Sequence, residues 1–115
     1  MDIENIKAQM RKGILEYCIL SVIAESEIYA SDILEKLKQA HLIVVEGTLY
    51  PLLTRLKNDG LLEYRWIEST QGPPRKYYKL TTEGMTFLKE LANEWATLKF
   101  SVEECAKNYT ITTNQ

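Results

Sequence analysis

The sequence predicts a mainly α-helical fold with one small β-hairpin, and three observations support this prediction. Apolar residues recur every three or four positions over residues 3–24 and again over 81–109. Two shorter helical patterns lie between these stretches. They are followed by two alternating segments, 62–67 and 75–80, which turn residues separate. The expected order is therefore three helices, a hairpin and a long final helix.

The first predicted helix changes character along its length. Over residues 3–24 a narrow apolar stripe runs through Ile6 and Met10. It widens in the second half, where Leu15, Ile19 and Ile23 join it, as a segment packed on a core requires. The narrow first half is expected to meet another chain. A second helix follows from the spacing of Ala30, Ile33, Leu34 and Leu37.

The third predicted helix, 47–58, has two contrasting sides. Four leucines fall on one side, and small or polar residues fall on the other. The Asn58-Asp59-Gly60 run supplies a C-terminal stop. Pro51 lacks an N–H, and only the first turn of a helix has N–H groups to spare. The helix is therefore expected to begin near Gly47 or Thr48, or else to have a distorted first turn.

The two alternating segments predict a hairpin with a projecting loop over residues 68–74. Arg75 and Lys76 follow the expected Gly72-Pro73-Pro74 tip directly, where they could reach phosphates or simply be solvated. Most of the hairpin aromatics are interpreted as cross-strand packing against the helices, and a platform for stacking single-stranded bases is the less favoured alternative. These side chains are Tyr64, Trp66, Tyr77 and Tyr78.

Thr81 is predicted to cap the final helix, in which apolar residues alternate at spacings of three and four as a heptad repeat. A helix from 82 to about 108 would be roughly 40 Å long, too long to be buried by its own chain. We therefore expect a homodimer across this helix and the first. Its predicted interface residues are Ile6, Met10, Leu88, Leu91, Trp95, Leu98 and Val102.

This order of elements is that of a winged helix-turn-helix with a long C-terminal dimerisation helix. Residues 1–80 form the predicted DNA-binding domain, 81–109 the dimerisation helix and 110–115 a frayed tail. The second helix of such a unit enters the major groove, where small residues permit close approach and polar ones donate to phosphate. The predicted DNA-binding residues are Gly47, Thr48, Tyr50, Pro51, Thr54, Arg55, Arg75 and Lys76.

Two motifs carry a family resemblance. GTLYPLLTRLKNDGLLEYRW followed by GPPRKYYKLTTEG, within residues 12–90, resembles the small members of the PadR family of bacterial transcriptional regulators. The resemblance implies a homodimeric winged-helix protein that binds a pseudo-palindromic operator, usually as a repressor. It also implies that residues 47–51 form the recognition-helix motif and that Arg75 and Lys76 belong to the wing motif. The family often has a small polar capping residue where this chain has Val45, so no side-chain cap is expected here.

The resemblance also implies an effector, since many such regulators respond to phenolic acids or to hydrophobic aromatic compounds. Trp95 lies at the middle of the heptad stripe, where two symmetry-related indoles could sandwich a flat ligand or pack as interface core. The expected function is thus a sequence-specific repressor of double-stranded DNA that a small molecule releases. The alternative is a winged helix used for protein–protein contact.

Composition excludes other classes. The charge of −2 lacks the simple signature of a nucleic-acid-binding domain, a pI above about 9, but the hairpin 61–80 carries +4 and −2. Cys18 and Cys105 are expected to be free thiols in a cytoplasmic protein, with a lone disulfide as the alternative, and no membrane span is seen. No enzyme, metal or cofactor is predicted, because the single histidine, His41, has no catalytic or metal-binding neighbours and is expected to be a partly buried structural residue.

Overall fold

A computed structural model describes residues 1–109 of the 115-residue chain, so the predicted tail, 110–115, lies outside the described residues. Seven elements follow one another along the chain. They are α1 (Ile3–Glu25), β1 (Ile28–Tyr29), α2 (Ala30–Gln39), α3 (Glu46–Asn58), β2 (Leu62–Ser69), β3 (Gly72–Leu80) and α4 (Thr82–Ala106). The predicted order is confirmed, with one addition: the two-residue strand β1, which is too short to show any periodicity.

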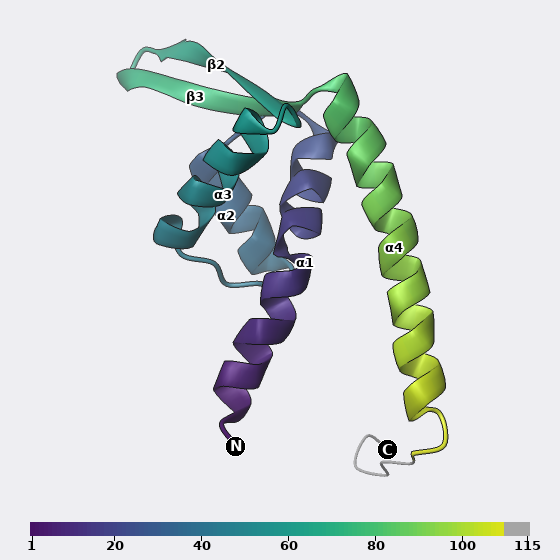
Figure 1. Cartoon of the computed structure of the whole chain (residues 1–115). Helices are drawn as coiled ribbons and strands as arrows, with labels where there is room; N and C mark the ends of the chain where they lie inside the picture. Colours follow the sequence, from purple (N-terminus) through teal and green to yellow (C-terminus); the bar gives the residue numbers. More distant parts are fainter. Residues whose placement is uncertain (110–115) are drawn as a thin grey trace.

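The elements form a helical body with a sheet at one end (Figure 1). The antiparallel sheet has the order β1-β3-β2, and the β2–β3 hairpin projects beyond the body as a wing. Helix α4 leaves the root of the wing and runs down the side of α1 that faces away from α2 and α3 (Figure 1). No helix within residues 1–109 is long and apolar enough to cross a membrane.

The core gathers one face of each of the first three helices against the root of the wing. Only the second half of α1 contributes, through Ile19, Leu20 and Ile23, which are almost fully buried. The first half stays outside, where Met10 is 71% exposed. The widening of the apolar stripe along this helix therefore marks where the core begins. The remaining core residues are Ile28, Ala30, Ile33, Leu37, Leu49, Leu53, Leu56, Leu62 and Tyr78.

Helix α3 begins close to the predicted start. It starts at Glu46, and Val45 provides no side-chain cap, as the sequence indicates. Instead the Val45 carbonyl accepts from the backbone N–H groups of both Thr48 and Leu49, each at 3.0 Å. Pro51 is the sixth residue of the helix and lies just past its first turn. Having no N–H, Pro51 cannot donate to the carbonyl of Gly47.

The predicted loop over residues 68–74 is also wrong. Both strands extend into it, and only Thr70 and Gln71 lie between them, with an irregular register between Ile67 and Ser69. Proline in a strand usually argues for a loop, because it cannot donate to the ladder. Here β3 pairs with β1 only at Tyr77 and Tyr78, so its outer part has a neighbour on one side alone. Pro73 and Pro74 lie in that outer part and are tolerated there.

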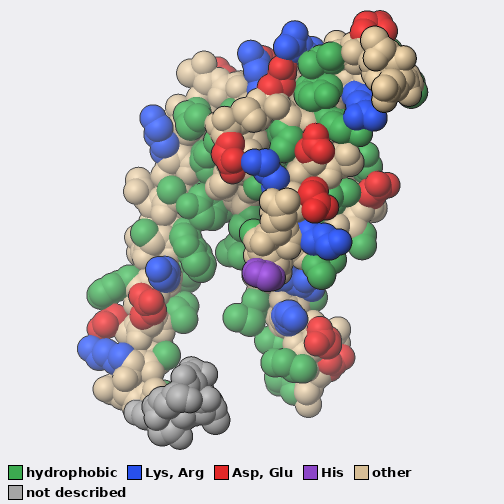
Figure 2. Space-filling view, turned by 180° about the vertical axis from the view of Figure 1, so that it is seen from behind, with side chains coloured by type: hydrophobic (Ala, Val, Ile, Leu, Met, Phe, Trp, Pro, Cys, Tyr) green, Lys and Arg blue, Asp and Glu red, His purple; other side chains and the backbone are tan. Residues whose placement is uncertain are grey.

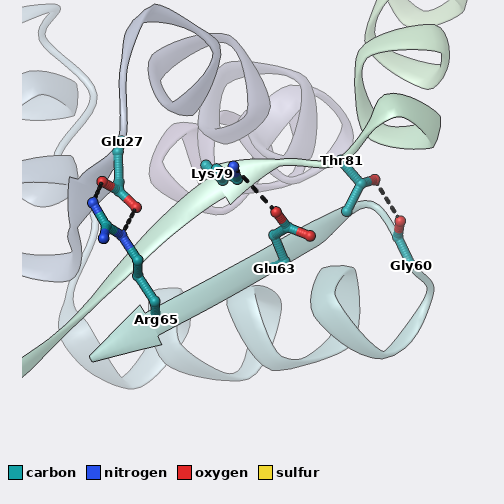
Figure 3. A network of polar contacts seen from close by, with 6 residues as sticks. All are labelled: Glu27, Gly60, Glu63, Arg65, Lys79 and Thr81. Atoms are coloured by element: carbon teal, nitrogen blue, oxygen red, sulfur yellow. Dashed lines mark hydrogen bonds and ion pairs between the residues drawn. The ribbon is translucent and has the colours of Figure 1, made fainter. Parts of the chain in front are cut away.

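Thr81 joins the wing to α4 and confirms the predicted cap. Its Oγ1 accepts from the backbone N–H of Gly84 at 2.9 Å, and its hydroxyl donates to the carbonyl of Gly60 at 2.6 Å (Figure 3). Its own N–H donates to the carbonyl of Leu61 at 3.1 Å. The start of α4 is thereby fixed to the segment that links α3 to β2.

The far end of α4 has little to pack against within one chain. The helix ends at Ala106, two residues before the predicted end, and Leu98 is 55% exposed. Figure 2 shows the outer parts of α1 and α4 as two separate limbs, with hydrophobic side chains along them. Leu88 and Leu91, nearer the start of α4, are partly buried against the core.

Candidate nucleic-acid interface

The outward surface of α3 is small and polar. Gly47, Pro51 and Thr54 are exposed on the side opposite the buried leucines, and, apart from the adjoining backbone of its own helix, no atom of residues 1–109 lies within 4 Å of where a Gly47 Cβ would be. A backbone this accessible can approach another molecule closely. Tyr50, 46% exposed, lies at the border of this surface that faces the sheet. The sequence-predicted face of the recognition helix is thus present in the structure.

The two remaining α3 candidates, Thr48 and Arg55, lie at the other border of this surface, next to α1. The Arg55 guanidinium forms an ion pair with Glu16 of α1, although about half of its side chain remains exposed. Together with Arg11 and Lys12 of α1, both residues line a cavity of about 660 Å³ between the two helices. Arg55 is therefore held toward α1, which the spacing along α3 alone does not reveal.

The wing has two different faces, and the candidates Arg75 and Lys76 lie on opposite ones, because neighbouring strand residues alternate. The Lys76 ammonium lies 4.3 Å from the centre of the Tyr64 ring and 5.4 Å from that of Trp66. The Arg75 guanidinium lies over the ring of Tyr29, 4.5 Å from its centre. The sequence prediction treats the two cations as one pair, whereas the strand separates them.

Lys76 lies on the face that adjoins α3. The Lys57 ammonium of α3 is 5.7 Å from the centre of the Tyr64 ring, and that ring packs 5.8 Å from the buried ring of Tyr78. Within residues 1–109, neither Lys57 nor Lys76 has a carboxylate within 4 Å. Both cations instead lie over aromatic rings. We call this face, with Lys57, Tyr64, Trp66, Lys76 and Tyr78, the lysine face of the wing.

The opposite face neutralises most of its charge internally. Arg65 donates to both carboxylate oxygens of Glu27, at 2.6 and 2.8 Å, and Lys79 pairs with Glu63 at 3.4 Å (Figure 3). The hydrogen bonds from Arg65 lower the pKa of Glu27, with a further contribution from the charge of Arg65. The bidentate pair ties the segment before β1 to β2 across β3 (Figure 3).

The aromatic side chains of this surface differ in exposure. The interpretation of most of them as packing holds for Tyr78, which is 5% exposed, and Trp66, which is 62% exposed, is the exception. Both lie on one face of the hairpin. Exposure rises along this face from Tyr78 through Tyr64 to Trp66, so the helical body covers only the root of the wing. The distance of position 66 from the hairpin root is the one signal that could have indicated this exposure.

Four of the seven predicted dimer residues are exposed in the single chain, whereas Ile6, Leu88 and Leu91 are partly buried. Trp95 is 38% and Val102 58% exposed on α4, and Met10 is exposed on the outer half of α1. Their role at an interface stays a prediction.

The described residues offer little for metal or catalytic chemistry. No group of three or more metal-ligating side chains occurs within residues 1–109. His41 is exposed, where partial burial was expected, and it lies two residues after the end of α2 with a left-handed backbone at φ 66°. Both cysteines in this part of the chain are free thiols.

A helix with a small, polar outer surface beside a cationic wing defines the winged helix-turn-helix class of proteins. The model of the Transcriptional regulator PadR-like family matches residues 19–90, and the chain belongs to this family. It is accordingly a DNA-binding transcriptional regulator and not an enzyme.

Individual relatives agree with this assignment. A PadR-like transcription factor of Bacteroides fragilis is 65% identical with a TM-score of 0.75, over 89% of this chain and 99% of that one. A transcriptional regulator of Mycobacterium tuberculosis is 33% identical over 75% of this chain and 86% of its own length. PadR of Bacillus subtilis, solved in complex with operator DNA, is 24% identical with a TM-score of 0.63, over 69% of this chain and 46% of that one, and shares the fold.

Proposed function

We propose that the chain acts in the cytoplasm as a homodimeric repressor, which binds a pseudo-palindromic operator through α3 and the wing and is released by a small aromatic or hydrophobic effector. The observation that carries this proposal is the continuous surface formed by the outer side of α3 and the lysine face of the wing. It joins an accessible backbone at Gly47 to two cations, Lys57 and Lys76, that have no carboxylate partner in residues 1–109.

The outer side of α3 suits the major groove. Gly47 and Pro51 leave space for the backbone to approach base edges, and Thr48, Tyr50 and Thr54 carry hydroxyls that can donate to phosphate. Arg55 has the reach to contact a guanine edge, provided that it exchanges Glu16 for the base. Its loss should therefore cost about 1–3 kcal/mol of affinity and relax the preference at one operator position.

The wing suits the phosphate backbone. Lys76 extends the surface of α3 outward, while Arg75 presents a second cation from the other face of the same strand. Each phosphate contact releases counterions and steepens the fall of log K with log salt by about 0.9. The two cations are proposed to add affinity for any sequence, whereas α3 selects among sequences.

The exposed stripe on α4 supports the dimer. Leu98 and Val102 are more than half exposed, and the outer half of α1 leaves Met10 exposed as well. A two-fold dimer covers such stripes in pairs and presents two copies of α3 to two half-sites of inverted sequence. Trp95, in the middle of the stripe, would lie near its symmetry mate, where a flat aromatic molecule can be held between two indoles.

Binding to DNA selected by the protein itself tests the proposal. Duplexes enriched from a random pool are titrated with the protein at several salt concentrations, beside shuffled duplexes of the same composition. The proposal expects tight binding of the enriched duplex alone, with a steep salt slope that flattens in Lys76→Ala and Arg75→Ala. Lys107→Ala, at the far end of α4, is the matched loss of charge and leaves the slope unchanged. Equally weak binding of all duplexes would contradict a repressor and favour a protein–protein role.

The effector is tested separately. In the Trp66→Phe variant, Trp95 is the only tryptophan, since the sequence has two. Planar aromatic compounds should quench its fluorescence and loosen the complex with the enriched duplex. An unchanged emission spectrum at saturating concentrations of such compounds would count against Trp95 as part of the effector site.

A further inference from the structure

Trp66 is the largest apolar side chain of the wing and is not covered by its own chain. It is 62% exposed, whereas Tyr64, two residues nearer the root of the same face, is 38% exposed and Tyr78 is buried. Burial thus falls steadily along this face away from the helical body. Folding alone does not account for a tryptophan at this position, because removing its ring from water requires something outside the chain.

The surroundings of Trp66 hold it in a defined orientation. Its ring meets that of Tyr64 edge to face, at 88° with the ring centres 6.4 Å apart, and the Lys76 ammonium lies 5.4 Å from its centre. Lys76 is also its direct partner on β3. An aromatic side chain fixed by such neighbours loses little conformational entropy when it binds.

The charge around Trp66 indicates what kind of molecule binds this face of the wing. Among the regularly paired positions of this face, 62, 64, 66, 76, 78 and 80, there is no carboxylate, and Glu68 follows only where the register becomes irregular. The opposite face carries Glu63 and adjoins Glu27. Lys57 and Lys76 lie over the aromatic rings of the lysine face. The partner must therefore offer an apolar surface next to negative charge. The sugar–phosphate backbone of DNA offers both, since each deoxyribose lies between two phosphates.

The position of Trp66 on the wing argues against a second copy of the chain as the partner that covers its ring. The exposed apolar stripe proposed for dimerisation occupies the outer halves of α1 and α4, at the opposite end of the molecule from the wing (Figure 1). Trp66 instead continues the surface of α3, through Tyr64 and Lys57.

We infer that Trp66 is a DNA-contact residue, whose indole packs on the deoxyribose backbone flanking the half-site read by α3, with Lys76 beside it on a phosphate. The inference rests on the proposed function and adds to it an apolar contact that the wing motif of charged residues does not include. Because sugars are alike in every sequence, this contact raises affinity without selecting bases.

The test uses the full chain and a duplex enriched from a random pool. In Trp95→Phe, Trp66 is the only tryptophan, so its emission reports on the wing alone. We expect the duplex to shift or quench this emission. Trp66→Ala should bind about tenfold more weakly, the loss expected for one large buried side chain. Trp66→Phe should retain most of the affinity, and the salt slope should stay the same in both variants because no charge is lost. Ile67→Ala, on the opposite face of the same strand, is the matched control.

The outcomes separate this inference from the proposed function. If no duplex is enriched or bound, the proposed function fails. If the enriched duplex binds but neither the affinity of Trp66→Ala nor the emission of Trp66 changes, the inference alone is overturned. Because Trp66 is mostly exposed and packs only on Tyr64 and Lys76 along the wing, the thermal midpoint of Trp66→Ala should fall by no more than about 8 °C, and a variant that no longer folds would contradict a role confined to DNA contact. Loss of preference for the enriched duplex over shuffled ones would place the indole against bases and overturn the assignment to the backbone.

Discussion

Replacing Gly84 by alanine tests the junction that positions α4 against the wing. Gly84 is the only buried residue of α4, and a Cβ built on it would lie 2.0 Å from the carbonyl oxygen of Leu61. Ordinary contact begins at 3.4 Å, so the two backbones must separate by about 1.4 Å. Neither side can yield by rotating a side chain, because the obstructing atom belongs to the backbone.

The expected loss of stability follows from three contributions. Overpacking of this kind costs about 1–3 kcal/mol, and disturbing the hydrogen bonds of Thr81 to Gly60 and Leu61 adds about 1 kcal/mol. The better helix propensity of alanine returns about 1 kcal/mol. The variant should therefore be less stable by about 2 kcal/mol. For a domain of this size, that corresponds to a fall of roughly 8 °C in the thermal midpoint.

Thermal unfolding followed by circular dichroism measures this loss, at one fixed protein concentration because dimerisation would contribute to stability. Gly13→Ala in α1 is the matched control, because no atom of the described residues outside the adjoining helix backbone lies within 4 Å of where its Cβ would be. Alanine should raise stability by about 0.5–1 kcal/mol there. If Gly84→Ala is as stable as the unaltered protein, the close approach of α4 to Leu61 is refuted.

Three further predictions concern the interface, the dimer and the wing. Gly47→Ala should preserve or slightly raise stability, because its Cβ has open space, yet weaken binding to the enriched duplex severalfold; unchanged affinity would argue against close approach at this residue. Leu98→Asp should convert the proposed dimer to a monomer in sedimentation experiments without unfolding the winged helix, and a persistent dimer would exclude this stripe as the interface. Glu27→Gln should make the free energy of unfolding depend less on pH on the acid side. Arg65 lowers the pKa of Glu27 below its ordinary value near 4.5. The ionised Glu27 therefore contributes to the free energy of unfolding above that pH, and this contribution disappears as the pH falls through the lowered pKa. Identical acid unfolding of both proteins would refute this contribution.

Local patterns in the sequence predict most of the fold. The cap at Thr81, the four leucines of α3 and the widening stripe of α1 depend on neighbours within one or two turns, so spacing alone identifies them. The strand β1 is not predicted, because a strand of two residues shows no periodicity. Pro73 and Pro74 are read as a loop because the sequence does not reveal that this part of β3 has a neighbour on only one side.

The candidate site is less predictable than the fold, because its properties depend on contacts distant in sequence. Arg55 is paired with Glu16, 39 positions away, and no local spacing indicates this. The exposure of Trp66 depends on how far α3 extends beneath the wing. The separation of Arg75 from Lys76 does follow from strand alternation, but only when the strand is known to include both residues.

The symmetry of the selected DNA tests the central claim most directly. A two-fold dimer that inserts one α3 into each of two successive major grooves should enrich an inverted repeat from a random duplex pool. Its half-sites should lie about one helical turn, roughly 10–10.5 base pairs, or a multiple of it, apart. Two chains should bind each duplex. Enrichment of a single asymmetric site, or of no common sequence at all, would contradict the account.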